Sequence, residues 1–184
     1  MKTVLVTGGA GFIGSQFIRL LHAEEPDAQI VNLDALTYAG NLANLADVAS
    51  SPRYRFVRGD IRDIKVVLEL VAGADWIVNF AAESHVDRST KARAGEFIDT
   101  NVYGAYVMLE ATRQVNRTAR FLQVGTDEVY GDVPWPEFPS EQSLLQPSSP
   151  YSAAKAGADH IALAFHRTHE MDVLREYHRT LVAN

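Results

Sequence analysis

The chain has 184 residues, of which 47% are hydrophobic and 22% are charged, and it carries a formal net charge of −6. This composition is typical of one soluble globular domain, and the acidic balance argues against nucleic acid or an anionic membrane surface as the main partner. Because the sequence contains no cysteine, disulfides, thiolate metal sites and a catalytic cysteine are excluded.

The N-terminal residues and the apolar runs favour a soluble, cytoplasmic protein. Met1 and Lys2 lead directly into a strand-like run that breaks at Gly8, which differs from the apolar segment of a signal peptide. No apolar stretch approaches the roughly 20 residues that a membrane span requires. We therefore expect neither a membrane nor a nucleic acid as partner.

A glycine-rich turn is the first motif with a chemical meaning. Residues 2–7 read as a buried strand, glycines stand at positions 8, 11 and 14, and a helical run continues through residue 21. In such a context the glycines permit a tight turn, a close approach of backbone to pyrophosphate, and close packing of helix on strand. The amide groups and partial positive charge of the helix N-terminus also favour a phosphate. The alternative to dinucleotide binding is a plain packing turn.

A second strand over residues 29–34 ends in an acid. Asp34 lies about 20 residues beyond Gly14, where a carboxylate meets the ribose hydroxyls of a dinucleotide and disfavours a 2′-phosphate. The sequence therefore favours NAD over NADP.

Strands and helices alternate through the remainder of the chain. Further strands are expected over 54–58, 75–80 and 120–124, and helical runs over 42–48, 66–71, 96–114 and 150–167. This order predicts an α/β fold with a Rossmann-type, doubly wound parallel sheet. Asp60 either frames an adenine or belongs to the acids that cap the next helix. Thr100 and Asn101 either face the cofactor pocket or are merely tolerated within their helix.

Two adjacent acids follow the predicted strand 120–124. Thr126, Asp127 and Glu128 stand where a parallel sheet presents its ligand-binding edge. Neighbouring carboxylates repel each other, and burial disfavours ionisation, so their pKa values can separate into an acid and a base. The alternative is a surface turn with two solvated acids.

Tyr151 and Lys155 lie four residues apart, so a helix beginning near Ser149 places them on one face. A nearby ammonium stabilises a phenolate, which favours Tyr151 as a base. The alternative is that Tyr151 and Lys155 are an ordinary solvent-exposed pair, which is the usual case for this spacing alone. His85 has no partners at metal-ligand spacing, and no metal site is predicted.

Six motifs together resemble those of the dTDP-glucose 4,6-dehydratases, a nucleotide-sugar branch of the extended short-chain dehydrogenase/reductase superfamily. The resemblance covers the chain to about residue 173 and is carried by residues 7–14, 34–41, 59–63, 81–89, 126–131 and 151–155. The segments 34–41 and 126–131 are the most specific, since epimerases and decarboxylases of the superfamily lack the adjacent acid pair. The resemblance implies bound NAD, a nucleotide-sugar substrate and a homodimer joined through the helices near 96–114 and 151–167.

The resemblance also implies a role for each reactive group. Tyr151 takes the proton of the sugar C4 hydroxyl while hydride passes to NAD, Lys155 lowers the Tyr151 pKa and holds the nicotinamide ribose, and Thr126 hydrogen-bonds the C4 oxygen. Glu128 then removes the C5 proton, and Asp127 protonates the departing C6 hydroxyl. These five residues form the predicted catalytic set.

The predicted binding residues combine the glycine motif with what the resemblance implies. The cofactor set is Gly8, Gly11, Phe12, Ile13, Gly14, Asp34, Leu36, Thr37, Asp60, Ile61, Ala81, Ala82, Thr100, Tyr151 and Lys155. The substrate set is Ser84, Thr126, Asp127 and Glu128.

The sequence departs from the family pattern in three places. Gly125 stands where the family usually carries serine, and residues 90–97 match poorly and lack the usual proline. Beyond Arg175 the family continues into a substrate lobe that this sequence does not match. We therefore expect one NAD-binding Rossmann domain over residues 1–184, with the C-terminal substrate lobe missing or truncated. Two alternatives to the dehydratase remain: a nucleotide-sugar 4-epimerase or decarboxylase, and a truncated NAD-binding module without turnover.

Overall fold

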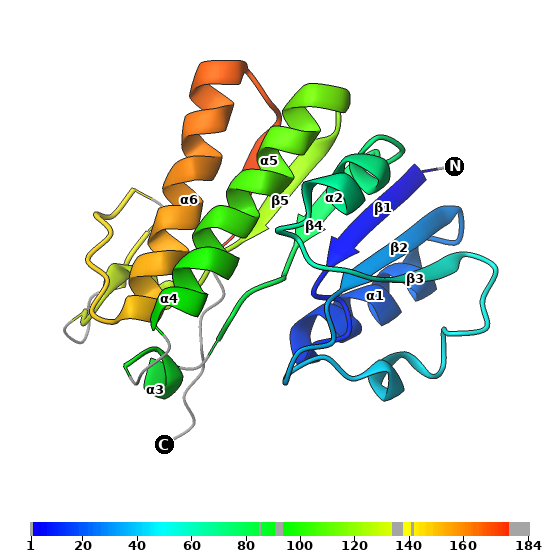
Figure 1. Cartoon of the computed structure of the whole chain (residues 1–184), viewed down its shortest axis with the longest axis horizontal. Coiled ribbons are helices and arrows are strands. Elements are labelled where there is room, and N and C mark those ends of the chain that lie inside the picture. The colour runs from blue at the N-terminus through cyan, green and yellow to red at the C-terminus, as the bar shows by residue number, and fades with distance from the viewer. Residues whose placement is uncertain (1, 85, 91–93, 134–137, 141, 177–184) are drawn as a thin grey trace.

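The computed structural model describes residues 2–84, 86–90, 94–133, 138–140 and 142–176 (Figure 1). Its centre is a sheet of six parallel strands in the order β3-β2-β1-β4-β5-β6. The strands are β1 (Lys2–Thr7), β2 (Ala28–Asp34), β3 (Tyr54–Arg58), β4 (Trp76–Asn79), β5 (Arg120–Val124) and β6 (Val173–Glu176). This order confirms the predicted Rossmann sheet, in which ligands bind outside the carboxyl ends of the strands where the order reverses, here between β1 and β4.

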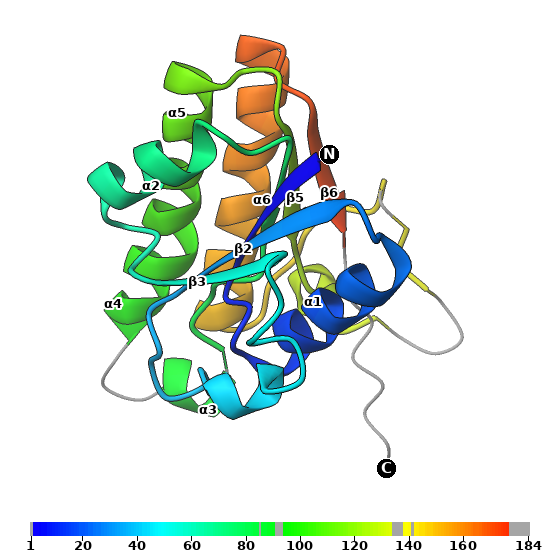
Figure 2. The same ribbon diagram turned by 90° about the vertical axis from the view of Figure 1, so that its right-hand side faces the viewer.

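Helices cover both faces of the sheet. They are α1 (Phe12–Glu24), α2 (Ile64–Val71), α3 (Val86–Ser89), α4 (Ala94–Phe97), α5 (Gly104–Val115) and α6 (Pro150–His169), with short turns η1 (Leu42–Leu45), η2 (Ile98–Tyr103) and η3 (Asp127–Tyr130). Figure 2 shows α2, α5 and α6 on one side of the sheet and α1 on the other.

Alternate side chains of the strands fill two separate cores. On the side of α2, α5 and α6, Leu5, Ile77 and Phe121 are fully buried among the residues of those helices. On the side of α1, the next residues along, such as Val6 and Val78, pack around Ile18. A parallel sheet that is covered on both faces requires this continuous apolar character.

The predicted helix 96–114 differs in detail from the observed one. Between α4 and α5 the segment η2 is a π-helix, in which each turn contains an extra residue. There Asn101 accepts a hydrogen bond from the Glu83 amide at 2.8 Å and donates one to the Glu83 carbonyl at 3.0 Å. The irregular turn thus joins this helix to the loop after β4.

Side-chain caps define where two helices begin. Asp63 accepts from the amide of Lys65 at the start of α2. Ser149 and Ser152 form a reciprocal capping box at the start of α6, followed directly by Pro150. The start of α6 near Ser149 was predicted, and the cap at Asp63 was one of two alternatives, because a short polar side chain satisfies amides that the first turn leaves unpaired. Within the described part of the chain, no helix is long and apolar enough to cross a membrane.

Candidate functional site

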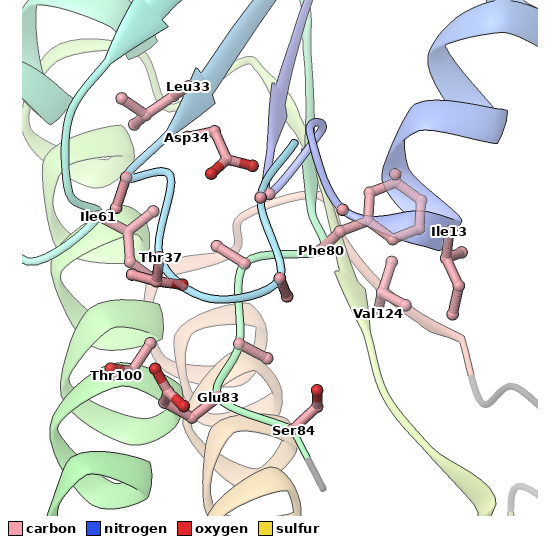
Figure 3. Close-up of a pocket in the computed structure, with 18 of the residues that line it drawn as sticks. Ile13, Leu33, Asp34, Thr37, Ile61, Phe80, Glu83, Ser84, Thr100 and Val124 are labelled. Carbon is pink, nitrogen blue, oxygen red and sulfur yellow. The ribbon is translucent and has the colours of Figure 1, made fainter. Parts of the chain in front are cut away.

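A cavity of about 400 Å³ opens at the carboxyl ends of β1, β2, β4 and β5. Its walls come from the turn after β1, the ends of β2 and β3, the loop after β4, and the start of α6. Figure 3 shows Asp34 and Thr37 on one side, Phe80 and Val124 across from them, and Ser84 at the far end. The cavity therefore lies at the carboxyl ends of the strands, as predicted, and next to the point between β1 and β4 where the strand order reverses.

The glycine turn forms its floor. Gly8 has a φ of 70°, and a Cβ there would lie 2.6 Å from the amide nitrogen of Ala81. A Cβ on Gly14 would lie 2.4 Å from the carbonyl oxygen of Gly8. Only glycine allows the strand, the turn and the helix to meet this closely. The turn is consequently packed against its own backbone and open toward the cavity.

Asp34 holds the edge of this turn. One carboxylate oxygen accepts from the amide of Ala10 at 2.9 Å, and the other accepts from the amide of Leu36 at 2.8 Å. Leu36 itself has a φ of 53°, a conformation that costs a non-glycine residue free energy and marks functional sites. Asp34 therefore anchors both the glycine turn and the segment that follows β2.

The segment after β3 supplies the next wall. Asp60 forms an ion pair with Arg62 at 2.6 Å, and the Arg62 guanidinium lowers the pKa of that carboxyl. Ile61 is buried, and a Cβ on Gly104 would lie 2.5 Å from it. Asp63 caps α2 while Asp60 lines the cavity, so the two readings of these acids apply to different residues.

The loop after β4 crosses the cavity and is tied to the segment after β2. The Tyr38 hydroxyl donates to the Ser84 carbonyl at 3.0 Å and accepts from the Ser84 amide at 3.2 Å. Thr100 lines the cavity, while Asn101 holds Glu83. Thr100 thus faces the cavity, as one of the two predicted alternatives held, whereas Asn101 does not line it and instead fixes the backbone of the loop after β4.

Helix α6 brings Tyr151 and Lys155 to the cavity wall. Lys155 is 4% exposed, and its ammonium donates a hydrogen bond to the Val124 carbonyl at 2.6 Å. Burial lowers the pKa of Lys155, and the negative charge of Asp159 opposes that shift. The pair occupies one face of the helix, as its spacing predicts.

The expectation that Lys155 lowers the pKa of Tyr151 is not met. Burial, together with the charges of Glu128 and Asp127, raises the pKa of the Tyr151 phenol to about 12, and a hydrogen bond with Thr126 opposes this shift. The reason is positional. The ammonium is directed to the Val124 carbonyl, and the charges that act on the phenol are those of carboxylates.

The turn η3 presents the adjacent acids to Tyr151. Thr126 caps the turn by accepting from the Glu128 amide, and it also hydrogen-bonds the Tyr151 hydroxyl. Burial raises the pKa of Glu128, with a further contribution from Asp127. A raised pKa makes the Glu128 carboxylate a stronger proton acceptor. The turn is therefore part of the site and not a solvated loop.

Most predicted residues lie at the cavity. Those that line it are Gly8, Gly11, Phe12, Ile13, Gly14, Asp34, Thr37, Asp60, Ile61, Ala81, Ala82, Ser84, Thr100, Tyr151 and Lys155. The structure places Thr126, Asp127 and Glu128 beside Tyr151, whereas Leu36 contributes its backbone amide to Asp34. His85 lies outside the described residues.

Sequence analysis missed several lining residues, notably Gly40, Arg62 and Glu83. Gly40 carried a detectable signal, because it follows the strand end at Asp34, where a Cβ would lie 2.8 Å from the carboxylate. Glu83 lies between the predicted residues Ala82 and Ser84, and its backbone is held by Asn101, 18 residues along the chain.

The cavity fits a dinucleotide. A floor of glycine backbone, an acid at the end of the second strand and a helix N-terminus beside them are the parts that hold a pyrophosphate and a ribose. Among the described residues no group of histidine, aspartate and glutamate could hold a metal ion. The fold and the site thus define a dinucleotide-binding protein of the short-chain dehydrogenase/reductase type.

The family follows from comparison with known proteins. The family model described as GDP-mannose 4,6 dehydratase matches residues 5–178, and the chain belongs to this family. A dTDP-glucose 4,6-dehydratase from Streptomyces niveus is 51% identical over 175 residues, which are 93% of this chain and 51% of that protein. The chain thus spans about half the length of this relative.

Solved structures give the same picture. The dTDP-glucose 4,6-dehydratase DesIV from Streptomyces venezuelae, crystallised with NAD, is 50% identical with a TM-score of 0.89, over 95% of this chain and 55% of that one. A UDP-glucose 4-epimerase from Brucella ovis in complex with NAD is 27% identical with a TM-score of 0.83, over 96% of this chain and 51% of that one.

Proposed function

We propose that this chain supplies the cofactor site and the reactive groups of a nucleotide-sugar 4,6-dehydratase that acts on dTDP-glucose with bound NAD. The observation that carries the proposal is the convergence of the adjacent acids with Tyr151. Thr126 hydrogen-bonds the phenol, and the charges of Glu128 and Asp127 act on it. An oxidation group and an acid–base pair within one site are what dehydration requires, and an epimerase needs only the first.

The residues of the cavity floor fit NAD: Gly8, Gly11 and Gly14 would hold its pyrophosphate, and Asp34 would bind the adenosine ribose. When bound, NAD supplies a hydride acceptor for the sugar C4 and returns the hydride to C6, so the net reaction is loss of water. Asp34 is already held by two amides, and its remaining lone pairs favour hydroxyl donors over a phosphate.

The first step, oxidation at the sugar C4, would be carried out by residues at the start of α6. Tyr151 accepts the proton of the sugar C4 hydroxyl, and Thr126, already bonded to the phenol, orients the C4 oxygen. A base with a high pKa is a strong proton acceptor once it is ionised. Lys155 places a buried ammonium at the same wall.

The second step, elimination of water, would be carried out by the acids of η3. A ketone at C4 acidifies the C5 proton, which the Glu128 carboxylate removes. Asp127 donates a proton to the departing C6 hydroxyl, which leaves as water, and C5 regains a proton from Glu128 when the hydride is returned to C6. The raised pKa of Glu128 supports its assignment as the base, because proton affinity rises with pKa.

Product analysis with dTDP-glucose tests the proposal. We expect a 4-keto-6-deoxy sugar nucleotide, whereas a C4 epimer or released CO₂ would support the epimerase or decarboxylase alternative. The structural likeness to the Brucella ovis epimerase is the observation that favours that alternative. Binding of NAD without binding of dTDP-glucose would support the module without turnover, which the half-length match keeps open.

Replacing one acid tests its role directly. We expect Asp127→Asn to permit reduction of NAD, seen as NADH absorbance, and to slow the release of water from the sugar. The exposed Asp132, which follows the same turn, is the matched control, and Asp132→Asn should leave both steps unchanged. Full turnover by Asp127→Asn would refute the assignment of this residue as the acid.

A homodimer is a further part of the proposal. Ile98, Tyr103 and Tyr106 on η2 and α5 are 49%, 52% and 41% exposed, and the two tyrosine rings contact each other. Figure 1 shows α5 and α6 side by side at one end of the molecule. An exposed aromatic group of this kind favours burial against a second copy. Light scattering should show a dimer that Tyr106→Glu dissociates.

A further inference from the structure

Helix α6 buries two groups of opposite charge behind Tyr151. Lys155 is 4% exposed and Asp159, one helical turn further along, is 0% exposed. Lysine and aspartate are almost never buried so completely unless a partner compensates their charge. Residues four apart lie on the same face of a helix, so each is placed to act on the other.

The surroundings of Lys155 are polar but neutral. Thr7, Asn79 and Gln123 stand in register on β1, β4 and β5 and form a hydrogen-bonded row beneath α6. The Lys155 ammonium donates to the Val124 carbonyl at the end of this row. These groups accept or pass on hydrogen bonds, but none of them carries a charge that balances an ammonium.

Other charged groups around α6 act elsewhere. Asp127 and Glu128 on η3 act on Tyr151. Glu110 on α5 pairs with Arg113. Arg175 on β6 acts on Asp159. The charge that acts on Lys155 is that of Asp159.

Asp159 contrasts with the anchored carboxylate of Asp34. Among the described residues, neither oxygen of Asp159 has a hydrogen-bond partner, whereas both oxygens of Asp34 accept backbone amides. A buried carboxylate without hydrogen bonds depends on nearby positive charge.

We propose that Asp159 is a positioning residue whose buried negative charge keeps the Lys155 ammonium protonated at the cavity wall. The inference rests on the proposed function in one respect, namely that Lys155 serves the bound nucleotide. Burial raises the pKa of Asp159 to about 6, against the opposing charges of Lys155 and Arg175, so the carboxyl is ionised above that pH. Below it, Lys155 loses its counter-charge. No proton transfer by Asp159 is involved.

The titration of Lys155 tests this inference without any ligand. In protein labelled with ¹³C at the lysine side chains, Lys155→Met identifies the Lys155 resonance. In the unsubstituted protein we expect the resonance to move near pH 6, as Asp159 ionises, and again at its own pKa. Absence of the movement near pH 6 would overturn the proposal even if the Asp159 variants failed to fold.

Variants of Asp159 give the second measurement. Removal of the negative charge in Asp159→Asn should lower the Lys155 pKa by about one pH unit or more, since a nearby opposite charge favours the charged form. Asp159→Glu should restore much of that shift. An unchanged Lys155 pKa in Asp159→Asn, with a lower melting temperature alone, would mean that Asp159 has only a structural role.

Calorimetric measurement of NAD affinity tests whether the charge of Asp159 affects cofactor binding. On the alkaline side, where Asp159→Asn has lost the Lys155 proton, we expect about tenfold weaker binding than in the unsubstituted protein. Sugar-nucleotide turnover is measured separately. A protein that binds NAD with this pH dependence but forms no dehydrated product would refute the dehydratase and leave the role of Asp159 intact.

Discussion

The two walls of the cavity are built on different physical principles. The wall at β1 and β2 is made of backbone: Gly8 and Gly14 pack against main-chain atoms, and Asp34 accepts two main-chain amides. The wall at α6, beside which η3 lies, is made of side chains. There burial and neighbouring charges shift the pKa values of Tyr151 and Lys155. The first wall should therefore respond to changes of volume, and the second to changes of charge.

The largest expected effect tests the second wall alone. Tyr151→Phe removes the proton acceptor while keeping the ring that packs against Phe97. Turnover should fall by about 10²- to 10⁴-fold, the range for loss of a general base. NAD affinity should change little, because the glycine turn is untouched. Steady-state kinetics and calorimetry measure the two, with Tyr103→Phe, an exposed tyrosine at the end of η2, as the control.

The next effect tests the first wall alone. In Gly14→Ala the new Cβ would lie 2.4 Å from the Gly8 carbonyl oxygen, so the turn must shift. Overpacking of this kind costs about 1–3 kcal/mol of folding free energy. We expect weaker NAD binding and a lower denaturation midpoint together. Gly73→Ala, with open space around the new methyl group, should change neither. Unaltered NAD affinity in Gly14→Ala would contradict the packed-backbone account.

A third substitution changes charge in the second wall. Glu128→Gln removes a negative charge that opposes ionisation of the Tyr151 phenol, so the Tyr151 pKa should fall from about 12 toward the ordinary value. Phenolate absorbance against pH measures this shift after subtraction of the Tyr151→Phe titration. Glu69→Gln on the exposed side of α2 is the control. A Tyr151 pKa that rises or stays fixed would show that the acids do not act on the phenol.

The smallest effect concerns the start of α6. Ser149→Ala removes the capping oxygen that accepts from the Ser152 amide, and about 1 kcal/mol of unfolding free energy should be lost. Urea denaturation measures the loss, with the exposed Ser50→Ala as the control. The Tyr151 pKa should be retained, because the cap fixes the helix end and not the charges around the phenol.

Local sequence was sufficient wherever the interaction partners lie within a few residues. The strand–glycine–helix order, the caps at Asp63 and Ser149, and the spacing of Tyr151 and Lys155 all depend on neighbouring residues. Alternating strands and helices also restrict the topology, because parallel strands need crossover connections of one hand. The family and the sheet could therefore be inferred before the structure.

The tertiary structure alone decided the electrostatics of the site. The pKa of Tyr151 depends on Glu128, more than 20 residues away, and the Lys155 ammonium bonds a carbonyl of β5. Likewise, Asn101 reaches Glu83 through an irregular helical turn. Sequence patterns reflect local geometry and periodic burial. A pKa depends instead on all the charges around the group and on how far the surrounding atoms exclude solvent from it. The residue types and their spacing were thus determined by the sequence, and the protonation states they favour were determined by the fold.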